Sequence, residues 1–350
     1  MSLQQIPESS AKSYETQQAL TAVALRAGRR AWANVDPSDI SASWLEQSVP
    51  LADVLSRLQS EAALDGAKSV PAALADQGFE VEPAYAVKPR AVAGFAGAGF
   101  DPVAAFEAAP IATKQRISAG VEPSAALLSG GAMLSSLLTT AMADAGRQGQ
   151  MLAIHSRPKV GWVRMLTPPS CSRCALLAGR ASGRTAFPRH PGCDCRAIPG
   201  LEGWEQDLTM NTGEYFESLP TAADLADQFP GMTVAERRKA GHVSQEDIFT
   251  VNGARAIRDG ADPGQVVNAR RGMYQVQTPG SFKWMATVEG ITKRGRGSRA
   301  MRAGGLGEMR KYPGHTRRRM TAQRLMPETI YQVARDQEDV LRLLKLYGYV

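Results

Sequence analysis

The chain has 350 residues, of which 43% are hydrophobic and 6% aromatic, and its formal net charge is +7. A chain of this size can bury at least one core, and we expect it to divide into two or three units that are rich in helix. A membrane-spanning helix needs about 20 consecutive apolar residues. The most apolar stretch of the chain, residues 125–145, is interrupted by serine and glycine. We therefore expect no membrane span.

The N-terminal part has the apolar spacing of helices. An amphipathic helix is predicted from Ser13 to about Asn34. A second helical stretch is predicted from Ser41 to Gln59, interrupted or started anew at Pro50, so that residues 51–64 form a helix of their own. Between residues 66 and 123, repeated prolines predict short helices joined by turns. Residues 125–145 predict a long buried helix.

All four cysteines lie close together in the sequence, with a histidine beside the second pair. The five potential ligands are Cys171, Cys174, His190, Cys193 and Cys195. Two thiolates separated by two residues can bind one ion from a tight turn, and a second such corner completes the tetrahedron of structural Zn²⁺. His190 with Cys193 repeats the two-residue gap, whereas Cys193 with Cys195 offers two softer thiolates, so all five stay candidates.

Two other uses of these cysteines compete with the metal. Two disulfides would need an oxidising compartment, but the N-terminal sequence has no charged region followed by an apolar one, so we expect reduced thiols. A nucleophilic pair of Cys171 and His190 would not call for three further cysteines. Structural zinc is the interpretation that uses the whole cluster.

The segments that flank the cysteines have strand character. Residues 159–166 and 196–199 predict a small β-ribbon whose turns carry the metal ligands. Because so small a ribbon has almost no core, the metal would supply its folding free energy, on the order of 10 kcal/mol. Chelation is expected to unfold it.

Beyond residue 200 the sequence again favours helices. Thr233 and Ser244 each begin a capping-box pattern, and residues 254–270 predict two short helices separated near Gly260. That pair is similar to a helix-turn-helix, although glycine and proline are equally ordinary in any turn. Pro327 predicts the first position of a helix, and a further helix is predicted before Gly348.

The positive charge is concentrated in one glycine-rich strip, residues 293–319. This basic strip has ten basic residues and one acid, a charge of +9, so the rest of the chain carries 31 basic and 33 acidic residues, or −2. The ten are Lys293, Arg294, Arg296, Arg299, Arg302, Arg310, Lys311, Arg317, Arg318 and Arg319. An extended strip of this kind suits either non-specific contact with DNA phosphates or docking on an acidic protein surface.

The cysteine region resembles a known family. Cys171-Ser172-Arg173-Cys174, the Leu177-Ala178-Gly179 step and the closing His190-Pro191-Gly192-Cys193-Asp194-Cys195 look like the motif of MuF-type phage minor head proteins. The likeness covers about forty residues. Asp194 stands where a basic residue is usual in the family, and the chain after residue 200 lies outside the motif.

This resemblance implies a structural virion component without enzymatic activity. It implies association with the portal protein and the major capsid protein, in the capsid interior or at the portal vertex, after assembly in the host cytoplasm. Double-stranded DNA, bound without sequence preference, is a further expected partner. Consistent with a structural role, the sequence has no Gly-x-Ser-x-Gly elbow, Walker loop or His-Glu-x-x-His pattern.

The predicted fold is mainly α with a small zinc-stapled β-ribbon, an α+β arrangement in three parts. Residues 1–150 form an elongated helical region for portal or capsid contact, residues 151–200 the zinc-binding ribbon, and residues 201–350 a helical region that carries the basic strip. Two other functions compete with a minor head protein. One is a zinc-containing DNA-binding protein of a phage or bacterium, and the other is a head maturation protease fused to this module.

Overall fold

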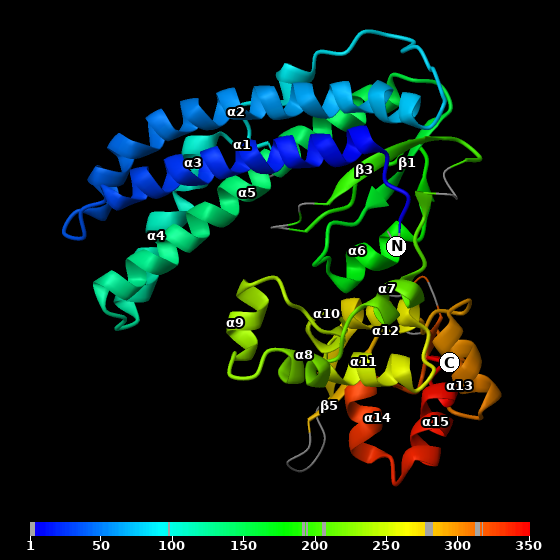
Figure 1. Ribbon diagram of the computed structural model, residues 1–350. Helices are drawn as coiled ribbons and strands as arrows, with labels where there is room; N and C mark the ends of the chain where they lie inside the picture. The colour runs from blue at the N-terminus through cyan, green and yellow to red at the C-terminus, as the bar shows by residue number, and fades with distance from the viewer. Residues whose placement is uncertain are drawn as a thin grey trace. The chain divides into compact units, whose positions relative to one another are not determined.

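The computed structural model describes residues 4–96, 99–190, 193, 195–204, 208–276, 283–311, 316 and 318–350. The chain forms two compact units (Figure 1). The first unit comprises residues 1–167 and 180–209, and the second comprises residues 168–179 and 210–350. Helices dominate both units, and the sheets are small. The predicted boundaries at residues 150 and 200 stay a prediction.

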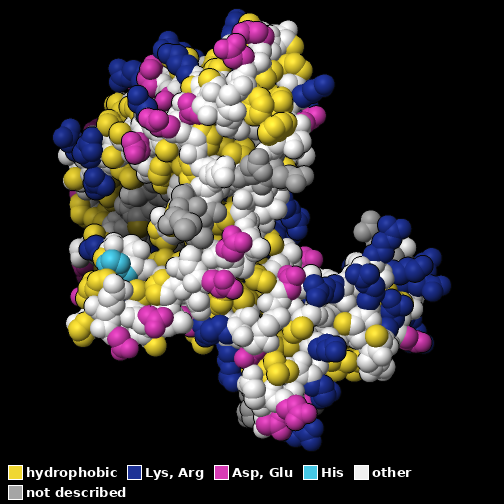
Figure 2. Space-filling model, turned by 45° about the vertical axis from the view of Figure 1, so that its right-hand side comes forward, with side chains coloured by type: hydrophobic (Ala, Val, Ile, Leu, Met, Phe, Trp, Pro, Cys, Tyr) yellow, Lys and Arg dark blue, Asp and Glu magenta, His cyan; other side chains and the backbone are white. Residues whose placement is uncertain are grey.

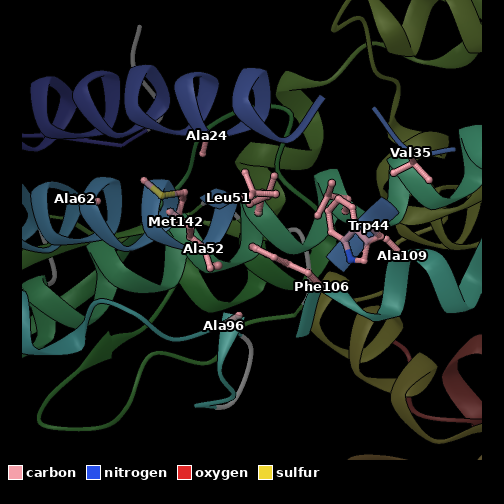
Figure 3. Close-up of a cluster of buried hydrophobic side chains, with 14 of the residues drawn as sticks. Ala24, Val35, Trp44, Leu51, Ala52, Ala62, Ala96, Phe106, Ala109 and Met142 are labelled. Atoms are coloured by element: carbon pink, nitrogen blue, oxygen red, sulfur yellow. The ribbon is translucent and has the colours of Figure 1, made fainter. Parts of the chain in front are cut away.

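Three long helices lie side by side in the first unit (Figure 1). They are α1 (Glu8–Ala33), α2 (Ile40–Asp76) and α5 (Pro123–His155), and the shorter η1 (Pro89–Val92), α3 (Pro102–Phe106) and α4 (Ala108–Ser118) pack against them. Their core is centred on Trp44, whose ring meets that of Phe106 edge to face with centroids 6.4 Å apart (Figure 3). Close approach also needs glycine: a Cβ at Gly66 in α2 would overlap the carbonyl oxygen of Gly146 in α5.

The expectation that Pro50 separates two helices is wrong. Helix α2 continues through both Pro50 and Pro71, which lie on its exposed face. An interior proline costs about 3 kcal/mol, but each large apolar side chain that α2 buries contributes roughly 1.5–3 kcal/mol, and Trp44 and Leu55 are among them. Tertiary packing therefore keeps this helix continuous.

The long helix predicted over residues 125–145 is confirmed, and as α5 it extends further at both ends. The expectation that it is buried is wrong for its first half, where Leu128 is 77% and Met133 41% exposed. By length and composition α5 is apolar enough to cross a membrane, and 33% of its most apolar window is buried. The core helix of a soluble protein passes the same test. In the structure α5 packs along α1, α2 and α4.

The predicted ribbon is confirmed and gains a third strand. Strand β1 (Val160–Met165) pairs antiparallel with β3 (Arg196–Leu201), and the short β2 (Ala181–Ser182) pairs with the other edge of β1. Every residue of β1 is buried. Val160 and Trp162 pack with side chains of α2 and α5, so this sheet shares a core with the helices.

The second unit combines short helices with two small sheets around a separate core. Its helices are α6 (Ser172–Ala178), α7 (Thr212–Ser218), α8 (Ala222–Gln228), α9 (Val234–Lys239), α10 (Gln245–Phe249), α11 (Val251–Arg258), α12 (Pro263–Ala269), η3 (Arg270–Gly272), α13 (Arg296–Ala303), α14 (Pro327–Val333) and α15 (Gln337–Leu346). Strands β4 (Met273–Val276), β5 (Trp284–Thr287) and β8 (Arg324–Leu325) form one sheet in that order, and β6 (Met309–Arg310) pairs with β7 (Arg319–Met320). These strands were not predicted from the sequence. Met301, Met326, Ile330, Leu344 and Tyr349 are fully buried in the core.

The local helix signals of this unit are confirmed. Thr233 and Ser244 form capping boxes at the starts of α9 and α10, and Pro327 is the first residue of α14. The predicted break near Gly260 separates α11 from α12. The expectation of an extended basic strip is wrong for residues 296–303, which form α13, because Met301 anchors this segment in the core.

Candidate metal centre

The first pair of cysteines lies at the start of α6. Cys171 is the residue that precedes the helix, its carbonyl accepts from the Ala175 N–H at 3.0 Å, and Cys174 is buried in the first turn. Just before them, the hydroxyl of Tyr215 donates to the Ser170 carbonyl at 2.8 Å and accepts from the Ser170 N–H at 3.1 Å. The expectation that all ligands lie at turns of the ribbon is therefore wrong for this pair, which a helix presents.

The second group of ligands leads into strand β3. The Cys193 N–H donates to the His190 carbonyl at 3.1 Å, and Cys195 directly precedes Arg196, the first residue of β3. Cys193 and Cys195 are 3% and 2% exposed, whereas His190 is exposed. Pro191, Gly192 and Asp194 lie outside the described residues.

The structure brings the five predicted ligands together. Their ligand atoms form two overlapping groups, Cys171 with Cys174 and His190, and Cys174 with Cys193 and Cys195, and within each group all atoms lie within 4.8 Å of one another. Zinc–sulfur bonds of about 2.3 Å place the sulfurs of a tetrahedral site about 3.8 Å apart, so this spacing is compatible with a metal ion.

Buried arginines contact Cys193 and Cys195. Arg147 of α5 donates from Nη1 to the carbonyl oxygens of Cys193 and Cys195, at 2.7 and 3.2 Å, and from Nη2 to Asp144 at 2.6 Å. Arg164 of β1 donates from Nη1 to the sulfur of Cys193 at 3.7 Å and from Nη2 to the carbonyl of Pro188. Cys193 is therefore contacted by side chains from both a helix and a strand.

One aromatic ring lies close to both arginines. The Arg164 guanidinium lies 4.0 Å from the centroid of the Phe187 ring, and that of Arg147 lies 5.6 Å from it. Trp162 stacks on the same ring with centroids 4.9 Å apart. Arg147 and Arg164 were not predicted as parts of this site, because nothing in the spacing of an arginine shows that its guanidinium reaches a cysteine far along the chain.

The predicted nucleic-acid residues lie just before α13, in α13, in strands β6 and β7, and between those strands. All of the described ones are exposed: Lys293, Arg294, Arg296, Arg299, Arg302, Arg310, Lys311, Arg318 and Arg319. Arg296 pairs with Asp262 at 3.3 Å, and Arg310 lies opposite Arg319 across the β6–β7 pair. Arg317 lies outside the described residues. Figure 2 shows Lys and Arg side chains gathered on the right of the view.

The fold and the site define a class of protein that has a unit of long helices, a small sheet and a cluster of cysteines. Residues 5–222 match the model of the family described as VG15 protein, and this is more than half of the chain. The chain belongs to the VG15 protein family, a phage-associated family, which indicates a phage protein. The match includes α1, α2, α5 and all five potential metal ligands. Neither the curated proteins nor the solved structures contain a match to the chain.

Proposed function

We propose that this protein is a MuF-like minor head protein of a tailed phage, which associates with the portal and major capsid proteins during head assembly. The observation that carries the proposal is the ordered motif from Cys171 to Cys195, within a stretch that matches a phage-associated family. The role is structural, with no catalytic step. The protein would assemble in the host cytoplasm and remain in the virion, in the capsid interior or at the portal vertex.

Within this role, a zinc ion would act as a structural crosslink. The donor set fits the ion, because Cys171, Cys174, Cys193, Cys195 and His190 are thiols and an imidazole of the kinds that zinc prefers. Metal analysis of the reduced, purified full chain is expected to find one zinc per chain.

Incorporation into particles tests the proposal. Phage heads are purified after complementation with the wild-type gene or with a Cys171→Ser/Cys174→Ser variant, and the copy number of the protein in heads is measured. We expect the variant to be lost from heads, while Ser172→Ala, a change between the two cysteines, is incorporated as the wild type is. Failure of the wild-type protein to co-purify with portal protein or to enter heads would refute the proposal.

The exposed basic strip favours a second candidate, a zinc-containing DNA-binding protein. Arginine and lysine side chains that neutralise phosphates give an affinity that falls steeply with salt. Salt-dependent retention on non-specific duplex, with no association with portal protein, would favour this candidate. Retention on duplex together with portal association would instead indicate a minor head protein that also contacts packaged DNA.

A further inference from the structure

An apolar groove of about 470 Å³ lies between α1 and α5 in the first unit. Its lining runs from Gly28 to Ala33 on α1 and from Leu127 to Ser135 on α5, and Val35 lies just beyond the end of α1. On each helix the lining residues are one or three positions apart, so they follow a single face. Eight residues of α5 correspond to about 12 Å at 1.5 Å per residue, so the groove is about two helical turns long.

The shape of the groove is fixed by contacts within the protein. Trp32, one of its walls, donates from Nε1 to the Leu127 carbonyl at 2.9 Å, and its ring meets that of Trp44 edge to face with centroids 5.1 Å apart. Gly131 keeps the opposite wall low, because a Cβ there would lie 3.0 Å from Cδ1 of Trp32. A groove that is formed before binding loses little conformational entropy when a ligand enters.

The walls and rim of the groove present apolar side chains to solvent. Leu128 is 77% exposed and Ala132 is also exposed, and residues 123–143 of α5 include no charged residue. Exposed apolar surface around a groove is typical of a site that another molecule covers. Because both walls are helices, their backbone groups are hydrogen-bonded internally and offer no strand edge. A helix that inserts apolar side chains at positions i, i+4 and i+7 matches a groove two turns long.

The charge beside the groove is positive. Arg29 is a lining residue, and the neighbouring Arg26 and Arg30 of α1 are exposed. Residues 16–35 contain these three arginines and no acid. The acids that follow and precede the two walls in the sequence, Asp36 and Glu122, each accept a hydrogen bond from a backbone N–H two residues further on. Charge complementarity therefore favours an occupant with acidic side chains beside its apolar face.

We propose that this groove binds an amphipathic helix of a partner protein, with apolar side chains in the groove and acidic side chains beside Arg29. The inference goes beyond the proposed function, because the groove is lined by α1, α5 and Val35 rather than by the predicted metal ligands or the basic strip. It requires neither zinc nor portal protein. A concave groove two turns long fits the individual side chains of a helix better than the broad surface of a bilayer.

Binding of a designed peptide tests the inference. The probe is a short fluorescent helical peptide with leucine at positions i, i+4 and i+7 and glutamate on both flanks, and its anisotropy is measured with the full-length chain. One control peptide has the same residues in an order that gives no apolar face, and another has lysine in place of glutamate. We expect saturable binding of the first peptide alone. No binding of that peptide, or equal binding of the reordered one, would overturn the inference.

A change on the groove rim locates the binding. We expect Leu128→Gln to weaken peptide binding about 10-fold, because an apolar contact of one leucine is lost. Leu128 is mostly exposed, so this change leaves the core intact. Leu45→Gln is the matched control, because Leu45 is 58% exposed on α2 and does not line the groove. Equal affinities for the two variants would place the peptide elsewhere and overturn the inference.

Charge reversal tests the acidic preference. We expect Arg29→Glu to weaken peptide binding about 10-fold at low salt and less at high salt, where charges are screened. Arg57→Glu, at an exposed position of α2, controls for net charge, and equal effects of the two changes would refute the role of Arg29. Co-sedimentation with vesicles of phosphatidylcholine and phosphatidylglycerol separates a membrane from a protein partner. Vesicle binding that Leu128→Gln abolishes, without binding of the peptide, would assign the groove to a membrane and overturn the inference.

Discussion

Gly149 of α5 and Ala63 of α2 lie backbone against backbone. A Cβ at Gly149 would overlap the carbonyl oxygen of Ala63, and the obstruction is main chain, which a rotamer change does not relieve. The approach of Gly66 to Gly146 repeats this contact within the same helix pair. The spacing of these helices therefore depends on the absence of side chains at particular positions.

The change Gly149→Ala should separate the two helices and destabilise the first unit. Overpacking of a close contact costs about 1–3 kcal/mol, and here the clash exceeds the roughly 1 kcal/mol that alanine gains over glycine in a helix. Denaturant unfolding followed by circular dichroism measures the loss. Ser136→Ala, at an exposed position of the same helix, is the control. A variant as stable as the wild type would show that the helices are further apart than described.

Arg324 ties the C-terminal residues to the core of the second unit. Its guanidinium donates to the carbonyls of Tyr347, Gly348 and Glu289 at 2.8, 3.1 and 3.1 Å, and it lies 4.3 Å from the centroid of the Tyr349 ring. Arg324 is 1% exposed. These contacts use most of the donors of one buried side chain to satisfy carbonyl groups.

The change Arg324→Met should therefore destabilise the second unit by about 3 kcal/mol, because buried carbonyls lose their donors. Thermal and denaturant unfolding measure this loss. Arg335→Met is the matched control: the Arg335 side chain is 83% exposed and its ion pair with Asp339 is worth at most about 1 kcal/mol. Equal losses in the two variants would contradict the role of Arg324.

Asp247 gives the start of α10 a pH dependence. Burial acts to raise its pKa, but hydrogen bonds from the Ser244 backbone and the Arg238 guanidinium outweigh this, so the pKa is lowered from its ordinary value of 3.8. A carboxyl whose pKa is lower in the folded state stabilises the fold above its unfolded pKa, and this stabilisation is lost as the pH falls through the folded value.

We therefore expect the stability difference between wild type and Asp247→Asn to be largest near neutral pH and to shrink as the pH falls below about 4. Denaturant midpoints measured from pH 7 downward test this expectation. The same change at the exposed Asp227 of α8 controls for the loss of one charge. A difference that stays constant with pH would show that the Asp247 carboxylate has no stabilising role.

The features that the sequence predicted are those with local causes. The capping boxes at Thr233 and Ser244 each involve a side chain and a backbone group three residues apart, and the spacing of Cys171 and Cys174 carries its own chemistry. Such signals need no knowledge of the rest of the fold. The cluster of five ligands was predicted in this way, and the structure brings them together.

The features that were missed depend on distant residues. Helix α2 passes Pro50 because the side chains around that residue are buried, and strand β8 exists because Arg324 and Leu325 pair with β5 some forty residues earlier in the chain. The Arg164 contact with Cys193 likewise joins β1 to a turn across the sheet. In each case the sequence shows one partner of the contact without indicating the other.

The basic strip offers a quantitative test on DNA. Each phosphate contact that is lost should reduce the slope of log affinity against log salt by about 0.9, so Arg310→Gln/Arg319→Gln should reduce it by roughly 1.8 if both residues contact phosphate. Retention of the full chain on non-specific duplex, measured across a series of salt concentrations, gives the slope. Arg26→Gln/Arg29→Gln removes the same charge from exposed positions of α1 and should leave the slope nearly unchanged. If both variants had equal slopes, the retention on DNA would depend on net charge alone. Docking on an acidic protein surface would then be the better explanation for the basic strip.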